Sequence, residues 1–328
     1  MNPDIIKETV VITGGSGLVG NGIKHWINNN SLASDGLYID YNKYNFIFMS
    51  SKDCNLLDYN QTYEYFSILR PSYVIHLAAN VGGLYKNMKH KVEMFLDNIT
   101  INNNVLKVCH EIKVKKLVSC LSTCIFPDNI QYPINENMLH NGIPHNSNDA
   151  YAYSKRMLDV LSSAYRQQYN DNFICVIPTN IYGSYDNFNL EDSHVIPGLI
   201  HKCYLAKHKD TDFIINGTGS PLRQFIYSKD LGRLLLWTLF SYDKQDNIIL
   251  SPPQEYSIKY IGELIAKLFD LPDEKVKFDT TKNDGQFKKT ADSSRLFNYF
   301  PMFNFTSIDI GLSETVEWFL QNYNTARK

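Results

Sequence analysis

The feature that most constrains this chain is the alternation of short β-branched runs with longer amphipathic segments over its first 178 residues. Such alternation predicts parallel strands joined by helical crossovers, because parallel neighbours cannot be joined by a hairpin. We therefore expect an α/β fold with a Rossmann-type, doubly wound parallel sheet. The predicted strands are 9–13, 46–49, 73–77, 116–120 and 173–177, and the predicted helices are 20–30, 99–111 and 152–168.

The pattern changes after about residue 178, where loops rich in Asn, Asp, Gly and Pro separate predicted helices. These are 195–207, 228–240, 258–269 with Ser257 as its N-cap, and a last helix that Ser307 caps. We expect residues 1–178 to form the Rossmann domain and residues 179–328 to form mainly a smaller C-terminal α/β lobe that binds substrate. Because this lobe lacks a long apolar pattern of its own, a segment around 224–245 is expected to return and complete the sheet.

Composition narrows the class of protein. The 328 residues include 32 Lys and Arg against 34 Asp and Glu, a formal charge of −2, so nucleic acid is not expected as a partner. The apolar stretch 234–240 is far shorter than the roughly 20 residues that span a membrane, and residues 1–8 indicate a cytoplasmic start. Neither disulfides nor a metal site are expected, because no CxxC spacing occurs among the six cysteines: Cys54, Cys109, Cys120, Cys124, Cys175 and Cys203.

A glycine-rich loop follows the first predicted strand and precedes a predicted helix. Its sequence is Gly14, Gly15, Ser16, Gly17, Leu18, Val19, Gly20, which places glycines 14, 17 and 20 at GxxGxxG spacing. Glycines here permit a tight turn, close approach of the backbone to a pyrophosphate, and close helix–strand packing. The loop predicts dinucleotide binding.

Two interpretations of the next strand lead to different cofactors. If residues 37–40 form it, Asp40 would bind the ribose hydroxyls and select NAD. If residues 45–49 form it, the strand leads to Ser51 and Lys52, whose hydroxyl and ammonium suit the 2′-phosphate of NADP. The second run is longer and more apolar, so we favour NADP(H).

A catalytic set is indicated by Tyr151 and Lys155, four residues apart on a predicted helix, and by Ser122 after a predicted strand. Residues at this spacing share one helix face, so the Lys155 ammonium is expected to lower the pKa of Tyr151 and make it a proton donor near neutral pH. Ser122 would hydrogen-bond the same carbonyl oxygen. Tyr153 is the competing aromatic residue.

Together these motifs resemble the extended short-chain dehydrogenase/reductase family. The details resemble a branch of it that epimerises and then reduces a GDP-linked 4-keto-6-deoxy sugar. The matching segments occur in order over nearly the whole chain: 76–83, 122–124, 178–183, 186–188, 193–197, 223–227 and 284–289.

This resemblance implies a reaction and roles. GDP-4-keto-6-deoxy-D-mannose would be inverted at C3 and C5, and its C4 ketone would then be reduced with NADPH. Inversion needs two acid/base groups, and the resemblance implies Cys124 as the base and His194 as the acid. Ser122 and Tyr151 would hold the developing oxyanion, and Lys155 would position NADPH.

The resemblance also implies binding residues and a homodimer built on helices 99–111 and 152–168. One position departs from the family, because Asn216 stands where Trp is usual. The implied substrate contacts are Asn180, Lys202, Asn216, Arg223 and Asp284, with the Arg223 fork suited to a diphosphate. Besides the glycine loop, the implied NADP(H) contacts are Ser51, Lys52, Asn55, Leu56, Leu77, Ala78, Ala79, Leu121, Ser122, Tyr151, Lys155, Pro178, Thr179, Asn180, Ile181 and His194.

Two other hypotheses remain open from the sequence. One is a nucleotide-sugar 4-epimerase or dehydratase of the same superfamily; dehydratases usually carry an acidic pair near the serine, where this chain has Ser122, Thr123 and Cys124. The other is a non-catalytic NADP-sensing protein, whose signature would be a broken Ser/Tyr/Lys set.

Overall fold

The computed structural model describes residues 7–29, 35–282, 284 and 286–328. Residues 1–6, residue 30 of the first predicted helix, residues 31–34 and residue 285 of the last matching segment lie outside the described residues. The predicted α/β fold is confirmed: a six-stranded sheet has the order β10-β5-β4-β3-β1-β2, and every pair in it is parallel. Its strands are β1 Glu8–Thr13, β2 Tyr44–Met49, β3 Tyr73–His76, β4 Lys116–Cys120, β5 Phe173–Pro178 and β10 Ile248–Leu250.

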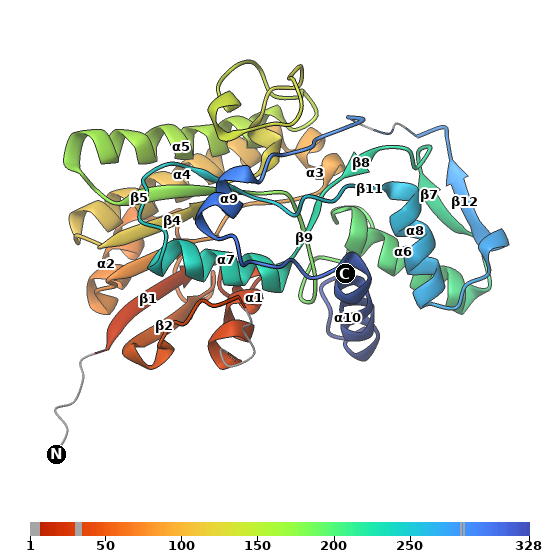
Figure 1. Ribbon diagram of the computed structural model, residues 1–328, viewed down its shortest axis with the longest axis horizontal. Helices are drawn as coiled ribbons and strands as arrows, with labels where there is room; N and C mark the ends of the chain where they lie inside the picture. Colours follow the sequence, from red (N-terminus) through yellow and green to blue (C-terminus); the bar gives the residue numbers. More distant parts are fainter. Residues whose placement is uncertain (1–6, 30–34, 283, 285) are drawn as a thin grey trace.

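Helices cover both faces of this sheet, as a parallel sheet requires. Figure 1 shows α4 (Lys91–Glu111) and α5 (Asp149–Tyr169) on one face, with α1 (Leu18–Asn28) and α7 (Ser228–Phe240) on the other. Successive residues of β1 divide between the two cores, because Val10 and Ile12 pack toward α1 and α7 whereas Val11 packs on the α4 and α5 side. α2 (Tyr59–Leu69) contributes Phe66 to the second core.

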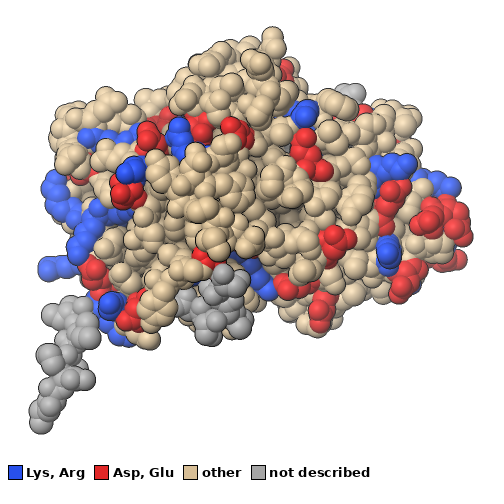
Figure 2. Space-filling model, viewed as in Figure 1, with Lys and Arg blue, Asp and Glu red and all other residues tan. Residues whose placement is uncertain are grey.

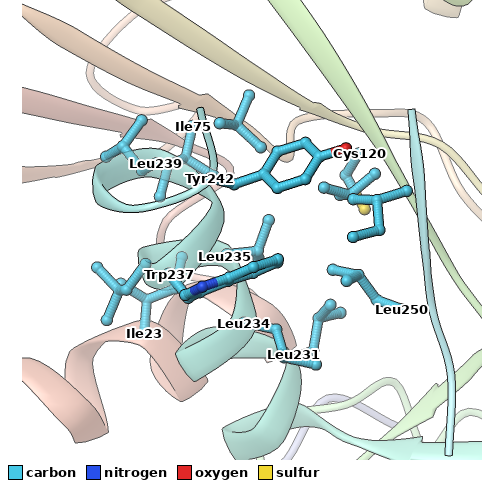
Figure 3. Packing of buried hydrophobic residues seen from close by; sticks show 14 of the residues in the cluster. Ile23, Ile75, Cys120, Leu231, Leu234, Leu235, Trp237, Leu239, Tyr242 and Leu250 are labelled. Atoms are coloured by element: carbon cyan, nitrogen blue, oxygen red, sulfur yellow. The ribbon is translucent and has the colours of Figure 1, made fainter. Parts of the chain in front are cut away.

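The core on the α7 side combines helix residues with strand ends. Figure 3 shows Trp237 of α7 and Tyr242 just after it, packed among residues that include Ile75 of β3, Cys120 of β4 and Leu250 of β10. Trp237 and Tyr242 are 4% and 2% exposed. α7 is therefore fixed against the central strands that lead into the candidate site.

A segment from the second half of the chain completes the sheet. The edge strand that it adds is β10, which pairs with β5. This strand lies just beyond the predicted segment 224–245, which instead contains β9 (Phe225–Tyr227) and α7. α9 (Ser294–Tyr299) also returns to this domain, because Leu296 and Phe300 belong to the same core as α7.

The smaller lobe has its own core around Phe213 and Phe319. Ser257 and Ser307 accept hydrogen bonds from the backbone N–H of Tyr260 and Ile310, so both predicted N-caps are confirmed. The lobe contains α6 Val195–Lys209, α8 Ile258–Leu268 and α10 Ile308–Gln321, and a parallel pair of strands, β7 Phe213–Asn216 and β12 Val276–Asp279. The structure also contains three short strands and a helix: β6 Asn180–Tyr182, β8 Leu222–Arg223, β11 Tyr256–Ser257 and α3 Leu84–Lys89. None of these four was predicted from the sequence, nor were β7, β9, β12, α2 or α9.

Charged side chains of both signs gather over the end of the lobe that carries α8 and β12, as Figure 2 shows for one face. The two signs are interspersed there, which agrees with the small formal charge. Within the described part of the chain, no helix combines the length and hydropathy needed to cross a bilayer.

Helices α1 and α7 cross at very short range through two glycines. A Cβ built on Gly22 would lie 2.1 Å from the carbonyl oxygen of Ser228, and one built on Gly232 would lie 2.4 Å from the carbonyl carbon of Gly22. Both neighbours are backbone atoms of packed helices, so neither can move aside cheaply.

We therefore expect Gly232→Ala to lower the free energy of unfolding by about 1–3 kcal/mol through overpacking. This outcome opposes the gain of about 1 kcal/mol that alanine brings to a helix interior. Gly198→Ala in α6 is the matched control, because its Cβ would meet the Ser193 hydroxyl, the end of a side chain that can rotate. Urea denaturation measures both; equal stabilities for the two variants would contradict this account.

Candidate active site

The glycine loop between β1 and α1 has no room for side chains. Gly14 has φ of 66°, which favours glycine, and a Cβ there would lie 3.0 Å from the Ala78 nitrogen. A Cβ on Gly15 would lie 2.7 Å from the Phe48 Cα, and one on Gly20 would lie 2.2 Å from the Gly15 oxygen. The loop is thus pressed against β2 and the loop after β3.

The loop suits a pyrophosphate. Gly17 is the N-cap of α1, no side chain among the described residues caps this end, and the first turn carries no acidic residue. Ser16 is exposed, and Gly17 is partly so. The first N–H groups of the helix therefore remain available to an anion, with the helix dipole favouring its negative charge.

A buried network joins the loops that follow β1 and β3. The Thr13 hydroxyl accepts from the backbone N–H of Leu77 and of Ala78, each at 3.1 Å, so its own proton goes to Nδ1 of His76 at 2.8 Å. His76 Nε2 then donates to the Asn102 side chain at 3.1 Å. Burial lowers the pKa of His76 to about 3, so the ring is neutral.

The structure decides between the two interpretations of the second strand. Residues 37–40 form no strand, and Asp40 precedes β2, at the end of the sheet opposite the glycine loop. Its carboxylate accepts from the Asn42 N–H, far from the ribose site expected at the carboxyl end of β2. Ser51 and Lys52 follow the carboxyl end of β2 and are both exposed.

The other predicted cofactor residues lie largely at this same carboxyl edge. Because all six strands are parallel, the segments that follow them meet along one side of the sheet. After β3 come Leu77, Ala78 and Ala79, and after β4 come Leu121 and Ser122. β5 ends at Pro178 and is followed by Thr179, and β6 begins with Asn180 and Ile181. The turn before α2 contains Asn55 and Leu56.

Ser122 and Cys124 are held in a single helical turn, Thr123–Ile125, just after β4. The Cys124 N–H donates to Ser122 Oγ at 3.4 Å. Arg156 of α5 holds the end of this turn, because its Nε donates to the Ile125 carbonyl at 2.5 Å. This bond attaches the turn to α5.

Lys155 joins α5 to the end of β4. Its Nζ donates to the Cys120 carbonyl at 2.9 Å and lies 5.9 Å from the centroid of the Tyr151 ring. Lys155 is 3% exposed, and this burial lowers its pKa.

The expected direction of the Tyr151 pKa is wrong for this structure. Burial raises the pKa of Tyr151 well above its ordinary value, and the thiols of Cys124 and Cys120 raise it further. Desolvation of the phenolate is the largest of these effects. Tyr151 keeps its proton at neutral pH in this state.

Cys124 is half-buried, and this burial raises the pKa of its thiol. The largest opposing effect comes from the ammonium of Lys289, followed by the Ser122 hydroxyl and the Lys155 ammonium. Lys289 lies in the matching segment 284–289, but no role was predicted for it. The pattern of two adjacent lysines, Lys288 and Lys289, does not indicate which one faces the site.

His194 stands apart from the other four predicted catalytic residues. It is exposed at the N-cap of α6 and, within the described residues, forms no hydrogen bond or ion pair with them. Its charge acts on Asp186, a carboxylate that is 4% exposed and whose pKa burial raises. The Gly83 N–H donates to the Asp192 carbonyl at 2.8 Å, which ties the loop before His194 to the segment after β3.

The predicted substrate residues fall into three groups. Two lie in the smaller lobe, and the third lies where the lobe meets the Rossmann domain. Lys202 Nζ donates to the Asn216 side chain at 3.4 Å. Asp284 accepts from the N–H and the hydroxyl of Thr218, both at 2.7 Å.

Arg223 and Asn180 lie closer to the sheet. Arg223 Nη2 donates to the Gln286 carbonyl at 2.5 Å, and Nη1 donates to the carbonyls of Leu222 and Phe287. Asn180 Nδ2 donates to the Gln224 carbonyl at 2.9 Å, next to Arg223 in sequence.

A family model for the NAD dependent epimerase/dehydratase family matches residues 10–256. The chain belongs to the NAD dependent epimerase/dehydratase family. Within this family it is 51% identical over 324 residues to GDP-L-fucose synthase of Dictyostelium discoideum, with 98% of both chains covered.

Two further members of the epimerase/dehydratase family match almost end to end. Probable GDP-L-fucose synthase of Drosophila melanogaster is 42% identical over 330 residues, which cover 98% of this chain and 100% of the fly protein. A crystal structure of GDP-L-fucose synthetase from Naegleria fowleri, bound to NADP, superposes with a TM-score of 0.91 at 46% identity. That alignment covers 98% of this chain and 95% of the amoebal one.

The glycine loop generates a prediction that separates binding from folding. Gly17→Ala keeps an ordinary φ of −83°, and its Cβ would meet only the Gly14 oxygen, at 3.3 Å. We expect it to leave the thermal midpoint nearly unchanged but to weaken NADP binding by about tenfold or more, because the methyl group stands where the anion approaches. Calorimetric titration with NADP measures the affinity.

Gly15→Ala is the comparison, because its Cβ would collide with the backbone of β2 and should lower the thermal midpoint as well. NADP affinity of wild-type strength in Gly17→Ala would show that the anion does not approach this loop.

Proposed function

We infer that this chain converts GDP-4-keto-6-deoxy-D-mannose to GDP-L-fucose, by inverting C3 and C5 and then reducing the C4 ketone with NADPH. The observation that carries this conclusion is the assembly of Ser122, Cys124, Tyr151 and Lys155 at the carboxyl edge of the sheet. Near-full-length identity to synthases of this product supports the same reaction.

The residues at the sheet edge fit NADP(H). The uncapped start of α1 would hold the pyrophosphate, and Ser51 and Lys52 would contact the 2′-phosphate at the end of β2. Lys155 would hold the nicotinamide ribose. When bound, NADPH supplies the hydride that C4 accepts.

Epimerisation requires a stabilised enolate. Protons on C3 and C5 are acidic because they lie next to the C4 ketone, whose oxygen would accept hydrogen bonds from Ser122 and Tyr151. The Cys124 thiolate takes the proton, and the electron pair of the broken C–H bond moves toward the ketone oxygen. His194 in its protonated form then delivers a proton to the opposite face of the carbon, which inverts it.

Reduction uses the phenol of Tyr151. Its raised pKa keeps the proton on the phenol until the C4 oxygen gains negative charge. The Lys155 ammonium, 5.9 Å from the Tyr151 ring centroid, offsets the charge left on the phenolate.

The nucleotide part of the substrate is assigned to the lobe, near Lys202, Asn216, Asp284 and Arg223. Because the Arg223 guanidinium already donates to carbonyls of residues 286 and 287, binding a diphosphate there is coupled to the position of that segment. Asn216 stands where the resemblance leads one to expect Trp, and its short amide offers less surface for stacking against the substrate.

Exposed apolar residues on α4 and α5 support a homodimer. Val92 and Leu96 of α4, and Tyr153, Met157 and Val160 of α5, are each at least 36% exposed and recur at helical spacing. Pairing of two such faces would form a four-helix bundle across a two-fold axis. A cytoplasmic location is consistent with six cysteines that are all unpaired.

The test of this function is direct. The full chain is incubated with GDP-4-keto-6-deoxy-D-mannose and either NADPH or NADH, and the product is identified by NMR. NADPH oxidation that yields GDP-L-fucose supports the proposal. A changed sugar without net NADPH oxidation would replace it with a 4-epimerase or dehydratase, and no reaction at all with a folded, NADP-binding protein would favour a sensor.

Cofactor choice gives a prediction for the end of β2. Lys52→Ala should lower kcat/KM for NADPH by about tenfold, through loss of one charge on the 2′-phosphate, and should leave kcat/KM for NADH unchanged. Asp40→Asn is the control and should alter neither value, because Asp40 lies at the opposite end of the strand. A change in NADH use in the Asp40 variant would contradict the assignment.

The two half-reactions give a second prediction. Tyr151→Phe removes the proton donor and should slow hydride transfer by about 100-fold or more. Cys124→Ser should abolish solvent deuterium exchange at C3 and C5 while sparing NADPH binding. The control is Tyr153→Phe, since Tyr153 is exposed on α5. Exchange at the wild-type rate in Cys124→Ser would show that another group is the base.

A further inference from the structure

The segment of residues 286–291 crosses from the lobe back to the catalytic domain and is clamped along its length. The Leu222 N–H donates to the Phe287 carbonyl at 2.9 Å, the Tyr132 hydroxyl donates to the Lys288 carbonyl at 2.6 Å, and the Ile134 N–H donates to the Thr290 carbonyl at 2.8 Å. These bonds come from β8 and from the loop after the Ser122 turn. The direction of each side chain in the segment is thereby fixed.

The side chains of this segment alternate. Lys288 lies 3.3 Å from Glu255, and the Thr290 hydroxyl donates to the same carboxylate. Since residues two apart in an extended segment share a side, Lys289 between them faces the other way. Among the residues that the structure describes, Lys289 has no hydrogen-bond or ion-pair partner.

Ala291, two residues after Lys289, shares its side of the extended segment. Ile134 and Ala291, which flank this part of the segment, belong to the buried cluster against which Cys124 packs. Burial lowers the pKa of Lys289, and the Cys124 thiol is the largest effect that opposes this. The effect is mutual: burial raises the pKa of Cys124, and the Lys289 ammonium is the largest effect that lowers it.

Two other cations lie near the thiol, and both donate to backbone carbonyls. Lys155 donates to the Cys120 carbonyl from within α5. Arg156 donates to the carbonyls of Ile125 and Gly142. Lys289 makes no such bond among the described residues, and the carboxylate that acts on it is that of Asp128. The other charged or titratable groups acting on the pair are Tyr151, Lys155 and Arg156 from α5, Arg223 from β8, and Asp128 from the loop after the Ser122 turn.

We propose that Lys289 is a positioning residue for epimerisation, whose ammonium is the counter-charge that stabilises Cys124 as the thiolate base. The proposal rests on the function inferred above. An opposite charge in a water-poor site stabilises a thiolate strongly, and only the thiolate can accept the C3 or C5 proton. Because Lys289 lies two residues after Phe287, whose carbonyl accepts from Arg223, substrate binding at Arg223 would also set the position of this cation.

The first test needs no substrate. The full chain is treated with iodoacetamide across a pH range, and alkylation of Cys124 is followed by peptide mass spectrometry. Lys289→Met should move the midpoint of Cys124 alkylation upward by about one pH unit, because the thiolate loses its counter-charge. Lys289→Arg should restore the wild-type midpoint. Lys288→Met is the matched control, since its side chain faces Glu255, and its midpoint should match the wild type.

The second test separates a chemical role from a structural one. Lys289→Met should slow deuterium exchange at C3 and C5 by about tenfold or more, with its pH optimum moved upward. Single-turnover oxidation of GDP-L-fucose by NADP⁺, which reverses the last step and needs no epimerisation, should keep its rate. An unchanged alkylation midpoint in Lys289→Met overturns the proposal. A shifted midpoint in a chain that makes no GDP-L-fucose keeps the pairing of Lys289 with Cys124 and overturns the function.

Discussion

The hydrogen bond from the buried ammonium of Lys155 to the Cys120 carbonyl is the contact on which the site depends. Cys120 ends β4, a strand in the middle of the sheet, and Lys155 lies one turn along α5 from Tyr151. A buried ammonium without an acceptor is strongly unfavourable, so this bond fixes the register of α5 against the strand end. The phenol of α5 and the Ser122 turn are thereby brought to the same edge.

The remaining parts of the site follow from parallel strands and from a chain that returns. Parallel pairing brings the segments after β1, β2, β3 and β4 to one edge, where the glycine loop and Lys52 face the same side as Ser122. The lobe then contributes Arg223, and the segment 286–291 carries Lys289 back to the thiol. Burial sets the chemistry, because it keeps the proton on Tyr151 and raises the pKa of Cys124 unless a cation opposes it.

Much of the fold could be predicted because the local pattern and the tertiary structure agree. The strand 116–120 and the helix 228–240 occur with the predicted bounds, and Ser257 and Ser307 cap the helices that follow them. The choice between Asp40 and Lys52 needed the structure, because two short apolar runs compete locally and only sheet pairing selects one. The short strand pairs β6–β9 and β8–β11 were not predicted, because each pair joins residues far apart in the sequence.

The site was predictable where spacing along one element decides it, as for Tyr151 and Lys155. Two features were not. The direction of the Tyr151 pKa depends on burial, and the side that Lys289 faces depends on Glu255 and Tyr132. His194 was identified only through the matched segments, and its place beside the buried Asp186 is a feature of the folded loop.

The central claim is that one edge of one sheet carries both the base for proton exchange and the proton donor for reduction. The most direct test is to run the reaction of the full chain in D₂O with unlabelled NADPH and to read the product by NMR and mass spectrometry. The account predicts GDP-L-fucose with deuterium at C3 and C5 and with protium from NADPH at C4. A reduced product without deuterium at C3 and C5 would contradict it, since reduction would then proceed without the Cys124 base.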